Sequence, residues 1–290
     1  MFHHIFCFRY KAVIEAANQF DRFFTGQITA AGKIPPAKVL VIGGGVAGLA
    51  AIGTARNMGA IVRGFDTRIT VKEQIESLGA EYLELNFKET GEGIGGYAKE
   101  MSNEFLQAER ELFAKQCPEV DIIISTALIP GKQAPVLITK EMIETMKPGS
   151  VVVDLAIENG GNIETSIEGK IYTHKPSGVI HIGLSDLPSR LATQSSTLYS
   201  NNISKFFLSM STPENDKFYI NLDDEVIRGS IVLHRGHLMW PPPVPAINFQ
   251  TNNSETENKE IMLSPPRQIL PKDNFQQTLK TSLLYSVGLG

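Results

Sequence analysis

The sequence predicts an α/β fold with a doubly wound parallel sheet, and three observations support this. Apolar strands alternate with amphipathic helices along most of the chain, an order that places helices on both faces of a parallel sheet. The apolar run 38–42 leads directly into the glycine pattern at 43–48 and then into a helix of small residues. A second strand, 61–66, ends in Asp66, about 20 residues beyond the glycines. Together these features predict a Rossmann-like sheet.

The expected elements follow from hydrophobic periodicity and from the turn residues between them. Helices are expected at 10–27, 46–58, 71–78, 97–116, 140–146 and 191–209, and strands at 38–42, 61–66, 82–85, 120–125, 150–155 and 179–182. After residue 213 the pattern changes. Two strands, 227–233 and 237–239, are expected to pair as a hairpin.

The glycine pattern Gly-x-Gly-x-x-Gly is suited to binding the pyrophosphate of a dinucleotide. Gly43 would make the tight turn, Gly45 would let backbone N–H groups approach the phosphates, and Gly48 would let the helix pack close to the strand. The helix N-terminus adds partial positive charge. Asp66 would accept the hydroxyls of the adenosine ribose and repel the extra phosphate of NADP, so NAD(H) is the expected cofactor. The alternative is a turn of the same shape that binds nothing.

Two loops are further candidates for the same site. The stretch 91–99 holds four glycines followed by Tyr97, and it is either a lid over bound nucleotide or an ordinary surface loop. The stretch 125–132 follows the fourth strand at its carboxyl end, where ligands bind in open α/β sheets. A plain strand-to-helix connection is an equally good interpretation of this second loop.

Composition excludes several other classes of function. A net charge of −4 over 290 residues gives no indication of a nucleic-acid partner. The two cysteines, Cys7 and Cys117, form no metal or redox motif, and the six histidines lack the spacing of a metal site. We therefore expect no metal. No apolar run is long enough to span a bilayer.

The sequence also lacks the groups that most dehydrogenases need. It contains no Ser/His/Asp grouping, no paired general acid and base, and no lysine isolated in apolar surroundings, so no catalytic residue is predicted. A dehydrogenase acting on an alcohol or amine must move a proton as well as a hydride. Direct transfer between two nicotinamide rings needs only that the rings be positioned.

In these motifs the chain resembles a known family, the NAD(H)-binding component of proton-translocating nicotinamide nucleotide transhydrogenase. The resemblance covers roughly residues 10–245, and the mitochondrial form is the most similar. It rests on long, specific motifs: Gly43–Gly48, Gly64–Arg68, Gly95–Met101, Ser125–Lys132, Val151–Ala156 and Asp186–Asn202.

The resemblance implies hydride transfer from NADH on this domain to NADP+ on a separate NADP(H)-binding domain, coupled to proton movement through a membrane domain. It also implies a homodimer at the mitochondrial inner membrane, with this domain on the matrix side. Carried over by motif, the residues that contact NAD(H) are Val46 and Gly48 at the pyrophosphate, Asp66, Thr67 and Arg68 at the adenosine ribose, Gly96 and Tyr97 in the mobile loop, and Glu109 and Leu128 at the nucleotide cleft.

The two ends of the chain depart from the family pattern. Residues 1–9 do not resemble the nicotinamide-contacting loop that precedes this region in the family, and residues 278–290 resemble the start of its first membrane helix. We therefore expect a fragment of a longer membrane enzyme, in which NAD binding survives better than catalysis. Besides the Rossmann domain, remnants of a second α/β subdomain are expected. The expected domains are a start unlike the family with a remnant linking helix at 1–33, the NAD(H)-binding Rossmann domain at 34–186, the returning helix and hairpin of the incomplete first subdomain at 187–248, a linker at 249–275 and the start of a truncated membrane segment at 276–290.

Two other functions remain open. Alanine dehydrogenase shares the fold and the glycine pattern, but it would need a substrate-binding lysine and a catalytic histidine in the N-terminal half, which this chain lacks. The third possibility is an NAD-binding remnant without catalytic activity.

Overall fold

The computed structural model describes residues 4–85, 87, 91, 101–128, 132–210 and 218–241. It divides the chain into two compact units, Met1–Ile220 and Asn221–Gly290. The domain boundaries expected from the sequence stay predictions. In the described residues, no helix combines the length and the apolar character needed to cross a bilayer.

The first unit is built on a seven-stranded sheet with the order β5-β4-β3-β6-β7-β9-β8. Its strands are β3 Lys38–Ile42, β4 Ile61–Phe65, β5 Glu81–Tyr82, β6 Ile122–Ser125, β7 Val151–Asp154, β8 Ile171–His174 and β9 Val179–Ile182. The chain first builds outward from β3 to β5 and then returns to β6 on the other side of β3. This reversal creates the crevice where α/β sheets bind ligands.

The predicted doubly wound parallel sheet is confirmed, and it carries one antiparallel strand at its edge. All neighbouring strands run parallel except β8, which pairs antiparallel with β9. Strand β8 was not predicted, because its side chains alternate between exposed and half-buried, as expected of an edge strand, and form no continuous apolar run.

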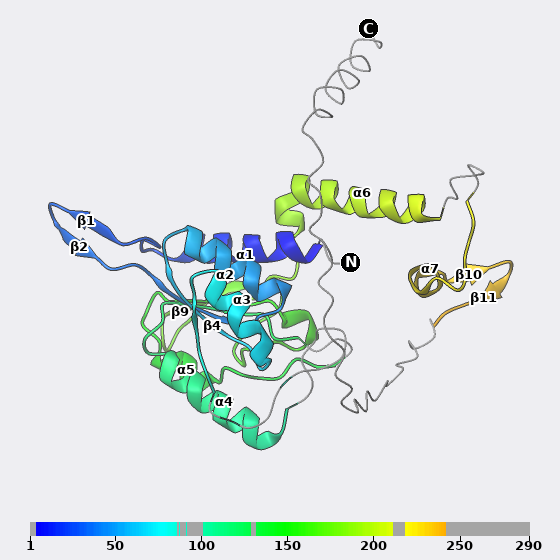
Figure 1. The fold of residues 1–290 in the computed structure, drawn as a ribbon. Coiled ribbons are helices and arrows are strands. Elements are labelled where there is room, and N and C mark those ends of the chain that lie inside the picture. The colour runs from blue at the N-terminus through cyan, green and yellow to red at the C-terminus, as the bar shows by residue number, and fades with distance from the viewer. Residues whose placement is uncertain are drawn as a thin grey trace, which may run out of the picture. The chain divides into compact units, whose positions relative to one another are not determined.

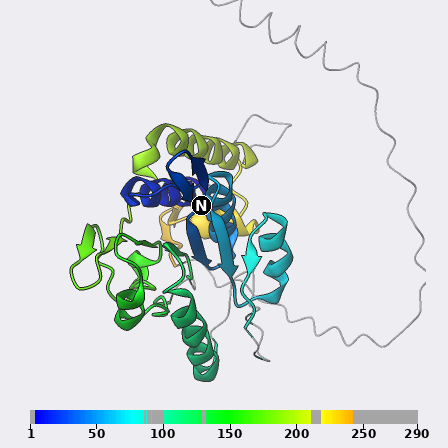
Figure 2. The same ribbon diagram turned by 90° about the vertical axis from the view of Figure 1, so that its left-hand side faces the viewer.

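Helices cover both faces of this sheet (Figure 1). They are α1 His4–Gln19, α2 Val46–Asn57, α3 Lys72–Ser77, α4 Asn103–Gln116 and α5 Lys140–Thr145, while α6 Ala192–Ser209 packs against α1. One core cluster joins α1, α2 and α3 to side chains such as Val39 and Val41, and a second joins α4 and α5 to Leu40 and Ile42. Successive side chains of β3 thus enter opposite cores. The view turned by 90° also shows α1 and α4 on opposite sides of the strands (Figure 2).

The first helix is shorter than predicted at its carboxyl end. It ends at Gln19, and residues 27–34 form a hairpin instead, with β1 at Gln27–Thr29 and β2 at Gly32–Ile34. Phe23 and Phe24 extended the apparent helical periodicity. In the structure only Phe24 is buried, while Phe23 is 56% exposed. The helix expected at 97–116 begins at Asn103, where the Ser102 hydroxyl accepts a hydrogen bond from the Phe105 N–H; residues 97–100 lie outside the described part of the chain.

In the second unit, the prediction of a strand at 227–233 was wrong. Residues Glu225–Ser230 form helix α7, and only Leu233–His234 (β10) and His237–Leu238 (β11) pair as strands. The apolar, β-branched residues of this segment suggested a strand. The helix is stabilised at its N-cap, where the Asp224 carboxylate accepts hydrogen bonds from the N–H groups of Val226 and Ile227.

A buried histidine occupies the edge of the first unit formed by β8 and β9. His181 is fully buried, its Nε2 lies 2.7 Å from the Thr165 hydroxyl, and its ring stacks on Tyr172 with 4.9 Å between centroids. Burial lowers the pKa of His181 to about 4, so the ring is neutral at physiological pH. It packs as a structural residue of this edge.

Candidate functional site

The turn between β3 and α2 has a geometry that only glycines allow. Gly43 has a φ of +98°, and its N–H donates to the Phe65 carbonyl at 2.8 Å, which ties the turn to the end of β4. A Cβ on Gly43 would lie 2.5 Å from the Thr126 hydroxyl. That hydroxyl is 3.2 Å from the Gly43 carbonyl oxygen. The ends of β3, β4 and β6 thus meet around one turn.

Two other glycines of the pattern have different surroundings. A Cβ on Gly48 would collide with the carbonyl group of Gly43, so Gly48 is required for α2 to pack against the turn. A Cβ on Gly45 would meet only the Arg68 guanidinium, at 3.9 Å. Gly45 is the N-cap of α2 and has no side-chain cap. The space beside it, at a helix N-terminus, is of the kind that binds phosphate groups.

Asp66 lies immediately after β4 and beside this turn. Its carboxylate is nearly buried and accepts a hydrogen bond from the Gly44 N–H at 2.6 Å. The Arg68 side chain forms a two-pronged pair with the same carboxylate, with Nε–Oδ1 and Nη2–Oδ2 distances of 2.8 and 2.9 Å. The Arg68 N–H adds a further bond to Oδ1. These contacts hold the carboxylate at the edge of the glycine turn.

Thr67 connects this segment to the glycine-rich loop. The N–H of Gly91, the first glycine of that loop, donates to the Thr67 carbonyl oxygen at 2.9 Å. The loop therefore starts beside the segment that was predicted to hold the ribose. Gly96 and Tyr97, the residues predicted to form the lid, lie outside the described residues.

Glu109 is buried on α4, close enough to Asp66 for their charges to interact. Burial raises the pKa of Glu109 to about 8, and the negative charge of Asp66 acts in the same direction, while Arg110 lowers the pKa. Arg110 itself is held by the Val136 carbonyl oxygen at 2.9 Å. Glu109 is therefore protonated at neutral pH and can donate a hydrogen bond as well as accept one.

This burial predicts a stability that falls as the pH rises. The Glu109 carboxyl ionises near pH 4.5 in the unfolded chain and near pH 8 in the folded one, so the folded chain holds an extra proton between these values. The contribution of Glu109 to the free energy of unfolding is therefore complete below pH 4.5 and is lost as the pH rises to 8. The free energy of unfolding falls by several kcal/mol over this range. In Glu109→Gln this part of the pH dependence should disappear from urea titrations. Glu111→Gln, at an exposed position of the same helix, should leave it unchanged; equal pH profiles for Glu109→Gln and the unchanged chain would contradict the assignment.

Leu128 lies three residues beyond β6, at the same edge of the sheet. Its side chain is 41% exposed, and the preceding Ala127 packs against the core. The structure therefore gathers most of the predicted residues at the carboxyl ends of β3, β4 and β6: Gly43, Gly45, Val46, Gly48, Asp66, Thr67, Arg68 and Leu128. Their binding of NAD(H) stays a prediction.

Sequence reasoning missed a buried polar group behind this edge. Asp154 at the end of β7 is fully buried, and its carboxylate accepts from the N–H groups of Ala156, Asn162 and Ile163 at 3.0, 2.9 and 3.0 Å. Burial raises the pKa of Asp154, and these hydrogen bonds oppose that rise. The pair Gly160-Gly161 before a polar residue, closely following a buried strand, was the available signal.

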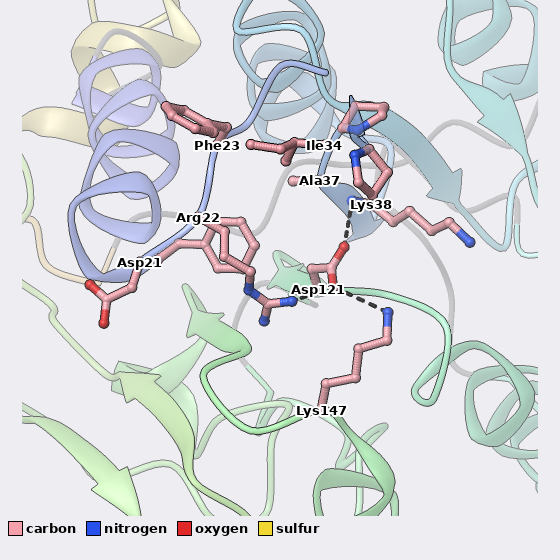
Figure 3. A pocket seen from close by; sticks show the side chains of 11 residues that line it. Asp21, Arg22, Phe23, Ile34, Ala37, Lys38, Asp121 and Lys147 are labelled. Atoms are coloured by element: carbon pink, nitrogen blue, oxygen red, sulfur yellow. Dashed lines mark hydrogen bonds and ion pairs between the residues drawn. The ribbon is translucent and has the colours of Figure 1, made fainter. Parts of the chain in front are cut away.

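A groove of about 760 Å³ lies at the opposite edge of the sheet, where β3 begins (Figure 3). Asp121 lies in it and accepts from the Lys38 N–H at 2.9 Å, from Arg22 at 3.3 Å and from Lys147 at 3.2 Å. These contacts tie together the end of α1, the start of β3 and the turn before β7. The groove is thus remote from the glycine turn. Within the ranges that the structure describes, no group of three or more His, Cys, Asp or Glu could hold a metal ion.

Comparison with known proteins relates the chain to two kinds of enzyme. The family model described as "Alanine dehydrogenase/PNT, C-terminal domain" matches residues 12–241. The chain is 52% identical over 263 residues to NAD(P) transhydrogenase subunit alpha of Haemophilus influenzae, covering 89% of this chain and 51% of that protein. It is 32% identical over 183 residues to alanine dehydrogenase of Methanococcus maripaludis, covering 61% of this chain and 43% of that protein.

A solved structure supports the relationship to transhydrogenase. The crystal structure of transhydrogenase from Sinorhizobium meliloti matches with a TM-score of 0.70 and 39% identity, over 81% of this chain and 62% of that one. The chain spans about half the length of the curated relatives it matches. The transhydrogenase relatives are bacterial, so they do not support the mitochondrial location expected from the sequence.

Proposed function

The chain belongs to the family described as "Alanine dehydrogenase/PNT, C-terminal domain", and we propose that within this family it is the NAD(H)-binding part of a proton-translocating transhydrogenase. Its higher identity to transhydrogenase subunit alpha, 52% against 32% for an alanine dehydrogenase, favours this activity over alanine oxidation.

The observation that carries the proposal is the joint placement of Asp66 and Gly45 around one turn. The open position at Gly45 leaves room for a pyrophosphate beside the N-terminus of α2. The Asp66 carboxylate lies next to it, held by the Gly44 N–H. A dinucleotide needs both an anion site and an acceptor for its ribose hydroxyls, and these residues fit it. For the ribose to reach Asp66, Arg68 would give up at least one prong of its pair.

The chemistry of the transfer comes from the nucleotide itself. A hydride, one proton with two electrons, leaves C4 of the dihydronicotinamide of NADH and joins C4 of NADP+, which gives NAD+ and NADPH. The residues of this chain would bind and orient the donor. The glycine turn would fix the pyrophosphate, Asp66 would fix the adenosine ribose, and the loop at 91–99 would close over the nucleotide.

The proposal extends to partners. We infer an NADP(H)-binding domain and a proton-conducting membrane domain in the same enzyme, and hence membrane association. We also infer a homodimer. The β1–β2 hairpin extends away from the sheet, and Ile28 on it is 82% exposed, as a residue covered by a second subunit would be in an isolated chain (Figure 1). Sedimentation equilibrium on the chain would measure its mass directly.

Two assays test the function. Calorimetric titration should give tighter binding of NADH than of NADPH. Hydride exchange between NADH and a spectroscopically distinct NAD+ analogue, measured with the NADP(H)-binding domain of a bacterial relative added, would favour the transhydrogenase. Formation of NADH that depends on alanine would favour an alanine dehydrogenase instead. Binding of NADH with neither activity would support a remnant, and no binding at all would overturn the proposal.

A further inference from the structure

Asn162 is a fully buried residue whose side chain joins three separate points of the chain. Its Nδ2 donates to the Ala127 and Pro135 carbonyl oxygens, each at 2.9 Å. Its Oδ1 accepts from the Ser125 hydroxyl at 2.8 Å. Ser125 is the last residue of β6, and Ala127 and Pro135 lie in the segment that follows it, so one side chain binds the end of the strand and two points of that segment.

The main chain of Asn162 reinforces the same contacts. Its carbonyl oxygen accepts from the N–H groups of Leu137 and Ile138 at 2.9 and 3.0 Å, and its own N–H donates to Asp154. Gly161 allows this arrangement, because its φ is +81° and a Cβ there would lie 2.7 Å from the Asp154 carboxylate. We call the contacts of Asn162 with residues 125–138 the Asn162 clamp.

The Asn162 clamp is connected to the glycine turn through consecutive residues. Ser125 and Ala127 bond to Asn162, and the hydroxyl of Thr126 between them lies 3.1 Å from the Ile42 carbonyl oxygen and 3.2 Å from that of Gly43. A shift of the segment would therefore move Leu128, whereas the glycine turn keeps its own anchor, the 2.8 Å bond from the Gly43 N–H to the Phe65 carbonyl oxygen. Buried hydrogen bonds are costly to leave unmade, so the clamp restricts such a shift.

From this geometry we propose that Asn162 is a positioning residue of the nucleotide site. It acts by fixing Thr126, Ala127 and Leu128 at the carboxyl edge of β6, and it does not itself contact the ligand. The inference rests on the proposed function, because it assumes that NAD(H) occupies this edge of the sheet.

The position of the clamp predicts which part of the nucleotide depends on it. A doubly wound sheet consists of two mononucleotide-binding halves. The glycine turn and Asp66 belong to the half formed by β3, β4 and β5, which takes the adenosine part. The clamp belongs to the half formed by β6, β7 and β9, which takes the nicotinamide part. Loss of the clamp should therefore weaken binding of NADH but not of AMP, which lacks the nicotinamide half.

The test compares the dissociation constants of NADH and AMP, measured by calorimetry on the whole chain. Asn162→Ala should raise that of NADH about tenfold, equivalent to about 1.4 kcal/mol, and change that of AMP less than about twofold. Ser125→Ala removes only one hydrogen bond to the Asn162 amide. This variant should raise the dissociation constant of NADH about threefold, equivalent to about 0.65 kcal/mol. Phe24→Ala, at a buried position between α1 and β1, is the control for general destabilisation. It should lower the melting temperature and leave both constants unchanged.

The possible outcomes distinguish failure of the positioning role of Asn162 from failure of the proposed function. NADH affinity that stays unchanged in both clamp variants, or falls together with AMP affinity, would overturn the positioning role. If Asn162→Ala does not fold, Ser125→Ala decides by the same comparison. Failure of the unchanged chain to bind NADH would instead overturn the proposed function, and the inference with it.

Discussion

Replacing Gly48 with alanine is expected to destabilise the first unit by on the order of 4 kcal/mol, although alanine is the better helix former. The intrinsic helix propensity favours alanine by about 1 kcal/mol. That gain is outweighed because the new methyl group would collide with the backbone of Gly43. Helix α2 would have to move away from β3, which opens the core around Ala51 and Ile52. Thermal unfolding followed by circular dichroism should give a melting temperature lower by roughly 10 °C.

Gly45→Ala is the matched control, and it should lower the affinity for NADH while leaving the stability nearly unchanged. The φ of Gly45 is −65°, which alanine adopts readily, and the nearest atom to a new Cβ is 3.9 Å away. Stability should therefore change by less than about 1 kcal/mol. NADH affinity should fall about tenfold or more, because the methyl group would occupy the space proposed for the pyrophosphate. Equal stability of the two variants would contradict the packing role of Gly48, and unchanged NADH affinity in Gly45→Ala would contradict the phosphate site.

Asp66→Asn is expected to weaken NADH binding by about 10- to 100-fold, the effect of losing a hydrogen bond to a charged group. The amide keeps the size of the side chain but loses the negative charge, and with it the repulsion of a 2′-phosphate. NADPH affinity should therefore fall much less, and the preference for NADH over NADPH should narrow. Calorimetric titration with both nucleotides measures this ratio.

The control for Asp66→Asn is Glu81→Gln, which removes the same charge on β5, where Glu81 pairs with Arg63. It should leave both affinities unchanged. A loss of NADH affinity with an unchanged NADH/NADPH ratio would have a different meaning. It would indicate that Asp66 acts by holding the Gly44 N–H, and it would rule out the contact with the ribose.

Most of the sheet could be predicted because its signals are local. The strands β3, β6 and β7 are buried on both faces, so they appear as apolar runs such as Val151–Val153 in β7. Strand β8 did not, because an edge strand faces solvent on one side. Residues 227–233 were misassigned because their β-branched side chains suggested a strand. One capping carboxylate, that of Asp224, stabilised a helix instead.

The candidate site divides in the same way. The glycine turn and Asp66 are separated by a characteristic number of residues, so their place in one site could be predicted from the sequence. Asn162 and Ser125 are 37 residues apart and carry no shared motif. The environment of Glu109 likewise depends on its burial beside Asp66, which is distant in sequence. Its raised pKa could not be inferred from the residue type.

The strand, turn and helix signals around Gly43–Gly48 and Asp66 lie next to one another in the chain, so they were sufficient to predict the Rossmann-like half and the family. The folded chain was needed to show that Gly48 is required for packing while Gly45 borders open space, and that Asp154 and Asn162 hold the segment after β6. Steric contact and hydrogen bonding depend on distance in space and not on separation along the chain. Residues distant in sequence come within that distance only when the sheet has formed.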